Sequence, residues 1–258
     1  MLHADRARAE AFGDDAERYE RTRPSYPPEL VDDLVAGGTP RVLDVGCGTG
    51  KAARLFAGRG CAVLGVEVDG RMAEIARSHG IEVEVAGFEA WEDRGRRFDL
   101  VVAGQAWHWV DPARGPAKAA SVLDAAGRLA PFWNFRRQPA EQVRRAFDEL
   151  YRRVAPEIAD GAMALGAVPS SNQSAGPLRS IEESGLFGSC DIRRYRWQQR
   201  YTTRAWCDLI PTHSDHHLLA PDRLDALLEG VATLIDGLGG VLVVDYETTA
   251  VIAAKKGA

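Results

Sequence analysis

Residues 42–50 read Val-Leu-Asp-Val-Gly-Cys-Gly-Thr-Gly, and this stretch decides the fold. Its first four residues are mostly apolar and predict a short buried strand, whereas the three glycines that follow predict a tight turn. Apolar residues then recur at helical spacing from Lys51 to about Ala57. The sequence therefore predicts a strand, a glycine turn and a helix in immediate succession.

The same alternation continues on the C-terminal side of the glycine turn. Strands that alternate with helices at this spacing form right-handed crossovers and a parallel sheet covered by helices on both faces. We therefore expect an α/β fold with a mostly parallel sheet. The further strands are predicted over residues 62–66, 81–85, 98–103 and 128–134, and the helices over residues 70–78 and 112–125.

Segments of a different character flank this region. Upstream, a charged helix is predicted over residues 7–21, and the proline-rich loop 23–28 is close enough in sequence to fold over the carboxyl edge of the sheet. Downstream, residues 141–154 predict a long helix, and residues 155–176, rich in Gly, Pro, Ser and Asn, predict an insertion or lid. The last predicted elements are a strand over 189–201, helices near 203–210 and 222–235, and an apolar strand over 241–244.

The length and composition fit one domain. A chain of 258 residues that is 45% hydrophobic can bury a substantial core. We expect a single domain over residues 1–258. It divides into an N-terminal lid segment over 1–38, a cofactor-binding core over 39–136, a helical insertion over 137–186, and C-terminal strands and helices over 187–258.

The charge and cysteine pattern narrows the partners and the compartment. The 32 Lys and Arg against 37 Asp and Glu give a net charge of -5, which disfavours nucleic acid. The longest uncharged run, 161–178, is broken by prolines and polar residues, so we expect no membrane span. The charged N-terminus lacks the apolar core of a secretory signal. Cys47, Cys61, Cys190 and Cys207 show no disulfide or zinc pattern, so we expect a cytoplasmic monomer or homodimer with reduced thiols.

Three nucleotide ligands use glycine turns at strand ends, and the residues discriminate among them. A dinucleotide fingerprint needs a glycine at its sixth position, which is Lys51 here. A phosphate-binding loop needs Gly at position 45 and Ser or Thr at position 52, where the chain has Val45 and Ala52. The cationic S-adenosylmethionine favours a carboxylate before the turn, which Asp44 supplies. Glu67, at the end of the second strand, has the spacing of an acceptor for two ribose hydroxyls.

The motifs VLDVGCGTG, VLGVEVD and FDLVVAGQAWHWVD resemble those of class I S-adenosylmethionine-dependent methyltransferases. The chain is similar to the branch that includes trans-aconitate methyltransferases through ERYERTRPSYP, QAWHWVD, YTTRAWCDLIPTHSDHHLL and GGVLVVDYET. The resemblance implies a Rossmann-like, mostly parallel sheet of seven strands with the last strand antiparallel, an N-terminal helical lid and an insertion after the fifth strand. It also implies S-adenosylmethionine as cofactor, S-adenosylhomocysteine as product and a small-molecule acceptor of unspecified identity.

The resemblance also assigns residues to the cofactor. Asp44, Gly46, Gly48 and Gly50 match the first cofactor motif, and Glu67 matches the acid that binds ribose. The other expected cofactor contacts are Cys47, Val68, Met72, Phe88, Glu89, Gln105, Tyr19 and Arg23. Of these, Met72 also lies on an apolar helix face and fits the hydrophobic core equally well.

The acceptor is expected beside residues 105–109, Gln-Ala-Trp-His-Trp, which continue the fourth strand past its carboxyl end. Strand alternation places Trp107 and Trp109 on one side and His108 on the other. Indole faces stabilise a nearby sulfonium, although core packing explains them as well. His108 is the candidate catalytic residue, either orienting the acceptor or taking its proton. Further expected substrate contacts are Tyr26, Trp133, Arg136 and His213.

The cluster His213, Asp215, His216 and His217 raises the question of a metal. Because no second group of ligands would close a tetrahedral site, we expect no metal and a polar loop near the site.

Methyl transfer from a sulfonium requires positioning and desolvation rather than activation of the donor. A carboxylate acceptor is ionised at pH 7 and needs no base, whereas an alcohol or phenol would need one. We therefore expect O-methylation of a carboxylate or hydroxyl. The alternatives are an NAD(P)-dependent oxidoreductase and a non-catalytic protein that binds S-adenosylmethionine.

Overall fold

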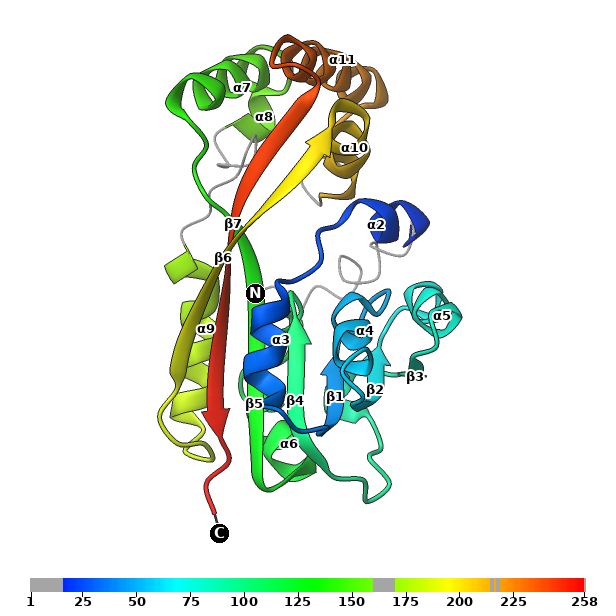
Figure 1. Cartoon of the computed structure of the whole chain (residues 1–258), viewed down its shortest axis with the longest axis vertical. Helices are drawn as coiled ribbons and strands as arrows, with labels where there is room; N and C mark the ends of the chain where they lie inside the picture. Colours follow the sequence, from blue (N-terminus) through cyan, green and yellow to red (C-terminus); the bar gives the residue numbers. More distant parts are fainter. Residues whose placement is uncertain (1–15, 160–169, 214–215, 217–218, 258) are drawn as a thin grey trace.

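A computed structural model describes residues 16–159, 170–213, 216 and 219–257 of the chain (Figure 1). The strands are β1 (Arg41–Val45), β2 (Ala62–Glu67), β3 (Glu82–Val85), β4 (Phe98–Gly104), β5 (Leu123–Arg136), β6 (Asp191–Thr202) and β7 (Val241–Ala254). The α-helices are α2 (Ala16–Thr22), α3 (Pro28–Val35), α4 (Lys51–Ala57), α5 (Gly70–Ser78), α6 (Gly115–Val122), α7 (Glu141–Val154), α8 (Pro156–Ala159), α9 (Ser170–Glu183), α10 (Thr203–Leu209) and α11 (Pro221–Gly237). Within the described part of the chain, the 3-10 turns named here are η3 (Phe88–Ala90), η4 (Trp107–Trp109) and η5 (Ile210–Thr212).

The strands form one sheet in the order β3-β2-β1-β4-β5-β7-β6. Strands β1 to β5 are mutually parallel, and β7 is antiparallel to both β5 and β6. The predicted mostly parallel seven-stranded sheet with an antiparallel last strand is therefore confirmed. The chain runs outward from β1 to β3 and then returns to β4, so the strand order reverses between β1 and β4. Ligands of open α/β sheets bind at the carboxyl ends of the strands beside such a switch point.

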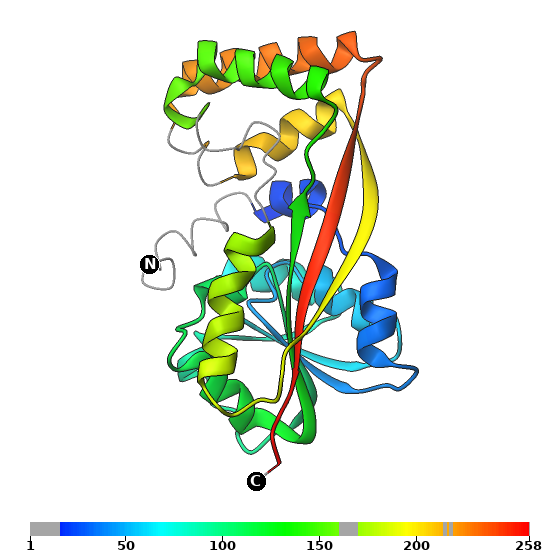
Figure 2. The same ribbon diagram turned by 90° about the vertical axis from the view of Figure 1, so that its left-hand side faces the viewer.

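Helices cover both faces of the parallel part of the sheet (Figure 2). On one face Leu30 of α3 and Phe56 of α4 are buried in a cluster with side chains of β1 and β4. On the other face Ala119 of α6 and Ile181 of α9 belong to a second buried cluster. Parallel sheets are stable in this arrangement because neither face is left exposed to water.

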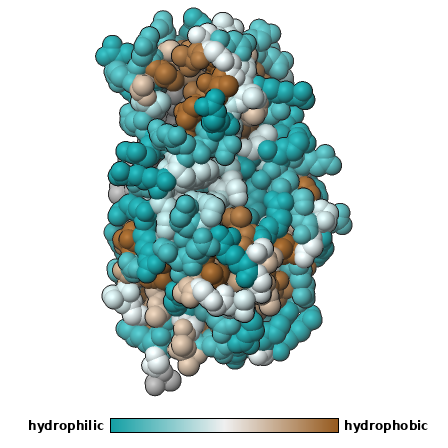
Figure 3. Space-filling view, viewed as in Figure 1, coloured by the Kyte–Doolittle hydropathy of each residue, from teal (hydrophilic) through white to brown (hydrophobic). Residues whose placement is uncertain are grey.

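Strands β5, β6 and β7 are much longer than the others and continue beyond the parallel sheet to a second group of helices (Figure 1). We call this group, α7, α8, α10 and α11 with the adjoining strand ends, the cap. It has its own hydrophobic cluster, which includes the fully buried Phe147, Trp206 and Leu227. The face in Figure 3 is mostly hydrophilic, with apolar side chains gathered over the cap and in smaller groups below it.

Helix α2 lies between the two halves and contacts both α5 and α10 (Figure 1). It covers the end of the predicted helix 7–21, whose earlier residues lie outside the described part of the chain. Among the described helices, none combines the length and the apolar composition needed to cross a membrane.

Several predicted boundaries were wrong for identifiable reasons. Strand β7 continues ten residues past the predicted end because Asp245 and Glu247, which break the apolar run, are satisfied across the strand pair by Gln198 and by arginines of β6. The predicted helix 112–125 ends at Val122, where Leu123 enters β5. Helix α3 was not predicted because its eight residues begin in a proline run.

Candidate active site

The glycine turn after β1 adopts a conformation that other residues rarely reach. Gly46, Gly48 and Gly50 have φ angles of 65°, 56° and 81°. The N–H of Gly46 donates to the carbonyl of Val66 at 2.8 Å, which ties the turn to β2. A Cβ atom at Gly46 would lie 2.6 Å from the Cβ of Ala106, so both the φ angle and the space require glycine there.

Asp44 lies directly before this turn. Its carboxyl group is buried, and its oxygens accept no hydrogen bond of normal geometry. Its exposure is 1%, and neither carboxylate oxygen has a hydrogen-bond partner. Burial, reinforced by the charge of Glu67, raises the pKa of Asp44 to about 8, although the nearby N–H of Ala53 opposes this shift without forming a well-shaped hydrogen bond. An unpaired buried carboxylate is costly unless a cation or donor reaches it. Asp44 therefore fits a positively charged ligand.

Glu67 supports the same turn from β2. Its carboxylate accepts hydrogen bonds from the N–H groups of Gly48 at 2.7 Å, Val68 at 2.9 Å and Asp69 at 3.0 Å. Burial raises the pKa of Glu67 even though these donors oppose the shift. A carboxylate offers about four acceptor positions, so one remains for a ligand. The contact of Glu67 with ribose stays a prediction. Its hydrogen bond from Gly48 in the glycine turn is observed.

The side chains of two predicted cofactor residues pack around the turn. Cys47 points toward β2, because a Cβ at Gly65 would lie 2.6 Å from its Sγ, so only the backbone of Cys47 is available to a ligand. Met72 is buried, and its Cε lies 3.5 Å from the Cβ position of Gly48. Met72 therefore belongs to the wall of the turn, and Val68 beside it is half-buried.

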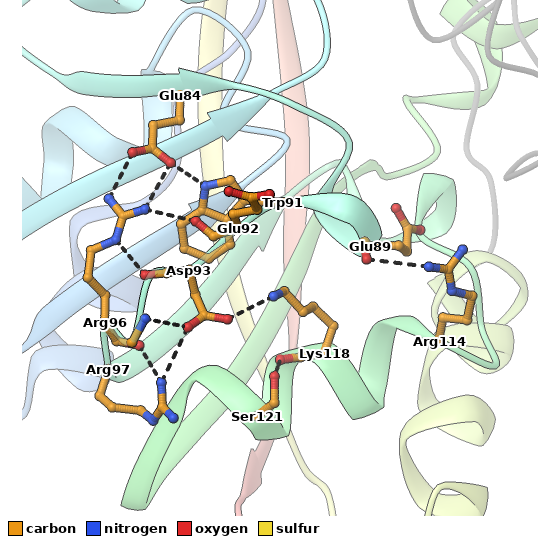
Figure 4. A network of polar contacts seen from close by, with 11 residues as sticks. Glu84, Glu89, Trp91, Glu92, Asp93, Arg96, Arg97, Arg114, Lys118 and Ser121 are labelled. Carbon is orange, nitrogen blue, oxygen red and sulfur yellow. Dashed lines mark hydrogen bonds and ion pairs between the residues drawn. The ribbon is translucent and has the colours of Figure 1, made fainter.

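The expected adenine border lies after β3, in a segment fixed by polar contacts (Figure 4). Phe88 is buried, and Glu89 accepts a hydrogen bond from the N–H of Asp111 at 2.7 Å. Two parallel hydrogen bonds of 2.9 Å join Arg96 to Glu84 at the start of the connection to β4. The segment is thus rigidly placed, and its contact with adenine stays a prediction.

Lys51 stands where a dinucleotide fingerprint would need a glycine. In the structure its side chain contacts Glu20 of helix α2. Its Nζ donates to the backbone carbonyl of Glu20 at 2.5 Å and lies 3.5 Å from the Glu20 carboxylate. Arg54, one helical turn later on α4, binds the same carboxylate at 2.6 Å. The helix that starts at the glycine turn therefore holds α2 in place.

The N-terminal segment after α2 lies against the carboxyl edge of the sheet. The Tyr26 hydroxyl sits 2.6 Å from the Cβ position of Gly104 at the end of β4. The Arg23 guanidinium lies 5.2 Å from the Tyr19 ring and donates to the carbonyl of Thr212 in the cap at 2.5 Å. Burial raises the pKa of both Tyr19 and Tyr26; the positive charge of Arg23 opposes this rise, whereas Glu67 reinforces it at Tyr19 and Asp44 reinforces it at Tyr26. The two tyrosines are therefore influenced by the acidic residues of the glycine turn as well as by Arg23.

We call Arg23, Arg136 and His213 the basic cluster. Arg136, the last residue of β5, lies with Nη2 3.1 Å from His213 Nε2 and with its guanidinium 5.4 Å from the Trp206 ring. Burial lowers the pKa of Arg23, and the charge of Arg136 lowers it further. Burial and both arginines hold the pKa of His213 well below its usual range.

The basic cluster has no internal counter-ion. Among the described residues no carboxylate forms an ion pair with Arg23 or Arg136, and the buried Nε of Arg23 has no hydrogen-bond partner. Two neighbouring cations that repel each other in a partly dry setting favour an anion between them.

Residues 107–109 form a 3-10 turn rather than a continuation of β4, so the predicted alternation of the two indoles and the imidazole was wrong. The turn arises because Gln105 adopts a φ of 58°, with its N–H bonded to the carbonyl of Phe132 and its side chain to that of Asn134. Gln105 thus shapes this corner, and its predicted contact with the cofactor stays a prediction.

The aromatic residues expected near the acceptor differ in burial, since some lie in the hydrophobic core and others are half-buried. Trp107 is 2% exposed and packs beside Phe88 in the hydrophobic core, and its predicted contact with the acceptor stays a prediction. Trp133 is fully buried, and its indole N–H donates to Nδ1 of His108 at 3.1 Å. His108 and Trp109 are half-buried, with ring centres 5.1 Å apart.

The described residues contain no group of three or more His, Cys, Asp or Glu side chains that is arranged to hold a metal. His216 is buried and its Nε2 lies 3.0 Å from the Tyr151 hydroxyl, while Asp215 and His217 lie outside the described residues.

Sequence reasoning missed the cap side of the site. Tyr201 and Tyr246 share a hydrogen bond of 3.0 Å, and burial raises the pKa of Tyr201 although the charges of Arg136 and Arg23 oppose the rise. Trp206 and the carbonyl of Thr212 also lie on this side. The sequence signalled these residues through the resemblance of the segments YTTRAWCDLIPTHSDHHLL and GGVLVVDYET.

Comparison with known proteins agrees with this architecture. A family model described as a methyltransferase domain matches residues 42–127. An uncharacterised methyltransferase of Mycobacterium tuberculosis is 40% identical over 137 residues, which are 52% of this chain and 56% of that protein. Residues 42–127 therefore resemble a methyltransferase domain. The chain spans about half the length of the curated relatives that it matches most strongly. A trans-aconitate 2-methyltransferase of Paracidovorax citrulli is 33% identical over 96 residues, 35% of this chain and 36% of that protein.

Solved structures share the fold of this chain. A structure assigned to a type II methyltransferase from Anaeromyxobacter dehalogenans has a TM-score of 0.67 at 21% identity, covering 92% of this chain and 99% of the other. A phosphoethanolamine N-methyltransferase from Haemonchus contortus, solved with S-adenosyl-L-methionine, has a TM-score of 0.54 at 14% identity and covers 99% of this chain and 60% of the other.

Proposed function

We propose that this protein transfers a methyl group from S-adenosylmethionine to an oxygen of a small anionic acceptor. One observation carries the proposal: the buried carboxyl group of Asp44 at the glycine turn accepts no well-formed hydrogen bond, and among the described residues the guanidinium groups of Arg23 and Arg136 in the basic cluster have no carboxylate partner. A cationic methyl donor and an anionic acceptor would neutralise the two sides in turn.

The residues of the glycine turn fit the donor. Asp44 offers two acceptor oxygens to the ammonium group of its amino acid part, and Glu67 offers its remaining lone pair to ribose. Arg23, with its unpartnered Nε, suits the carboxylate of the same amino acid part. When bound, the donor supplies a methyl group already activated by the positive sulfur.

The acceptor side rests on Arg136. Its guanidinium stands at the carboxyl end of β5 and is held from the cap by His213 and Trp206. His213 Nδ1 lies 3.2 Å from the Ile210 carbonyl, so this nitrogen carries the proton and Nε2 accepts from Arg136. The relative named as a trans-aconitate methyltransferase and those named as ubiquinone biosynthesis O-methyltransferases are consistent with O-methylation.

A binding experiment separates the cofactor classes. Isothermal titration with S-adenosylhomocysteine and with NADH should give saturable binding of the first and none of the second. Binding of NADH alone would support the oxidoreductase alternative and overturn the proposal.

A turnover experiment tests the reaction. The protein is incubated with S-adenosylmethionine labelled in its methyl group and a metabolite extract divided by anion exchange into anionic and neutral fractions. We expect label to enter products of the anionic fraction, and products that have lost one negative charge if a carboxylate is esterified. Saturable cofactor binding with no labelled product in any fraction would support the non-catalytic alternative.

A further inference from the structure

The hydrogen bond between Trp133 and His108 determines what the imidazole can do. An indole N–H is only a donor, so Nδ1 of His108 must accept at the observed 3.1 Å and cannot itself carry a proton. A neutral imidazole then carries its single proton on Nε2. Among the described residues, Nε2 of His108 has no hydrogen-bond partner.

The surroundings keep this tautomer in place. Trp133 is fully buried within β5 and has no freedom to withdraw its N–H. Protonating Nδ1 as well would set two donors against each other, and burial lowers the pKa of His108 to about 4. His108 is therefore neutral near pH 7 and presents a donor rather than a lone pair.

His108 is also well placed to meet the reacting groups. It stands in the turn η4, and Ala106 just before that turn lies against the glycine turn at Gly46. The strand that carries Trp133 ends three residues later in Arg136 of the basic cluster.

We propose that His108 donates a hydrogen bond from Nε2 to an anionic oxygen of the methyl acceptor, and that Trp133 is the positioning residue that fixes this tautomer. The inference rests on the proposed function. Of the two roles expected for His108, it favours orienting the acceptor over taking its proton, because Nδ1 accepts from Trp133 and Nε2 carries the proton.

The consequence concerns the class of acceptor. Without a base at His108, the acceptor oxygen must be ionised before it binds, as a carboxylate is at pH 7 and an aliphatic alcohol is not. This oxygen forms its new bond to the methyl carbon as the carbon–sulfur bond breaks, and the electron pair of that bond goes to sulfur. The products are a methyl ester and the neutral thioether, and no proton moves.

The test is a ¹⁵N NMR measurement of the imidazole nitrogens in the whole chain, with the His108 signals identified by their loss in His108→Gln. We expect Nε2 to be protonated and Nδ1 unprotonated from pH 6 to pH 8. In Trp133→Phe, we expect the preference to be lost and a Nδ1-protonated form to appear. Acetate, added to protein saturated with S-adenosylhomocysteine, should shift the Nε2 signal, whereas sodium chloride at equal ionic strength should not.

Three results would overturn the inference: Nδ1 protonated in the wild type, an imidazolium between pH 6 and pH 8, or no response of Nε2 to acetate. If Trp133→Phe does not fold, the tautomer of His108 in the wild type and the response of its Nε2 signal to acetate still test the inference. Saturation with S-adenosylhomocysteine is measured on the same sample, so failure of the proposed function appears separately as absence of that binding.

Discussion

The acidic and the basic sides of the site are assembled in different ways. Asp44, Gly46 and Glu67 lie on adjacent parallel strands and the turn between them, so a short piece of chain fixes their geometry. Arg23 and Arg136 come from the N-terminal loop and the end of β5, and Thr212 and His213 hold them from the cap. The acidic part of the donor site is thus a local structure, whereas Arg23, proposed to bind the carboxylate of the donor, and Arg136, proposed to bind the acceptor, depend on how the cap meets the sheet.

This difference indicates which part of the chain can change in sequence while the proposed methyl transfer is retained. Changes in the cap alter the residues that hold Arg23 and Arg136 while leaving Asp44 and the glycine turn intact. We expect the contacts of Asp44 and Glu67 with the donor to depend on the parallel part of the sheet, whereas the contact of Arg23 with the donor and the choice of acceptor depend on how the cap meets that sheet.

The largest loss of stability and of cofactor binding is expected from Gly46→Ala. The added Cβ would lie 2.6 Å from Ala106 at a φ of 65°, so strain and overpacking should lower the free energy of unfolding by about 2–5 kcal/mol. Binding of S-adenosylhomocysteine should be lost. Gly237→Ala in the cap is the matched control, because nothing lies within 4 Å of its Cβ position. Equal melting temperatures of the two variants would contradict this account of the turn.

The next effect is expected from Arg136→Gln. Loss of a charged hydrogen bond, worth about 1.5–3 kcal/mol, should raise the KM for the acceptor by about 10- to 100-fold. The Kd for S-adenosylhomocysteine should change less than about twofold, since Asp44 and Glu67 are untouched. The exposed neighbour Arg137 provides the control Arg137→Gln. An unchanged KM, or an equal loss of cofactor affinity, would place the acceptor elsewhere.

A smaller effect is expected from Lys51→Met, which removes one of the two cations that hold Glu20 and α2. Because the pair is partly buried, we expect cofactor affinity to fall by about 2- to 10-fold. Lys118→Met is the control, as Lys118 bonds Asp93 at 3.0 Å with similar exposure but away from the glycine turn. If both variants bind S-adenosylhomocysteine like the wild type, α2 is not coupled to the cofactor.

The last expected effect is a pH dependence of stability. The folded-state pKa of Asp44 is about 8, above its ordinary value of 3.8, so between these values the folded protein binds more protons than the unfolded one. Stability from this group therefore falls as pH rises through this window. Thermal melts from pH 5 to pH 8 should show a steeper decline in the wild type than in Asp44→Asn. Parallel curves would show that Asp44 is ionised throughout.

The sequence predicted the lower half well because its signals are local. Helices α4 and α5 begin and end where the spacing of apolar residues placed them, and Asp44 and Glu67 lie at the turn as expected. The basic cluster was predicted only as separate residues, because no local pattern brings Arg23, Arg136 and His213 together.

The remaining errors have the same origin. The length of β7 depends on polar partners in β6, a contact between segments far apart in sequence. The burial of Trp107 and the bond from Trp133 to His108 follow from the backbone of Gln105, whose positive φ ends β4 and starts a turn. The residue types at these positions indicated a functional site, but they did not show which way each side chain points or which atom donates a hydrogen bond.

The most direct test of the account is a calorimetric titration of S-adenosylmethionine at pH 7 in two buffers of different ionisation enthalpy. Asp44, largely protonated in the free protein, should lose its proton when the cation binds, so the wild type should release protons on binding. Asp44→Asn should release none and bind about 10- to 100-fold more weakly, whereas the exposed control Asp222→Asn should behave like the wild type. Equal affinity and equal proton release in Asp44→Asn and the wild type would contradict the claim that this buried carboxylate receives the methyl donor.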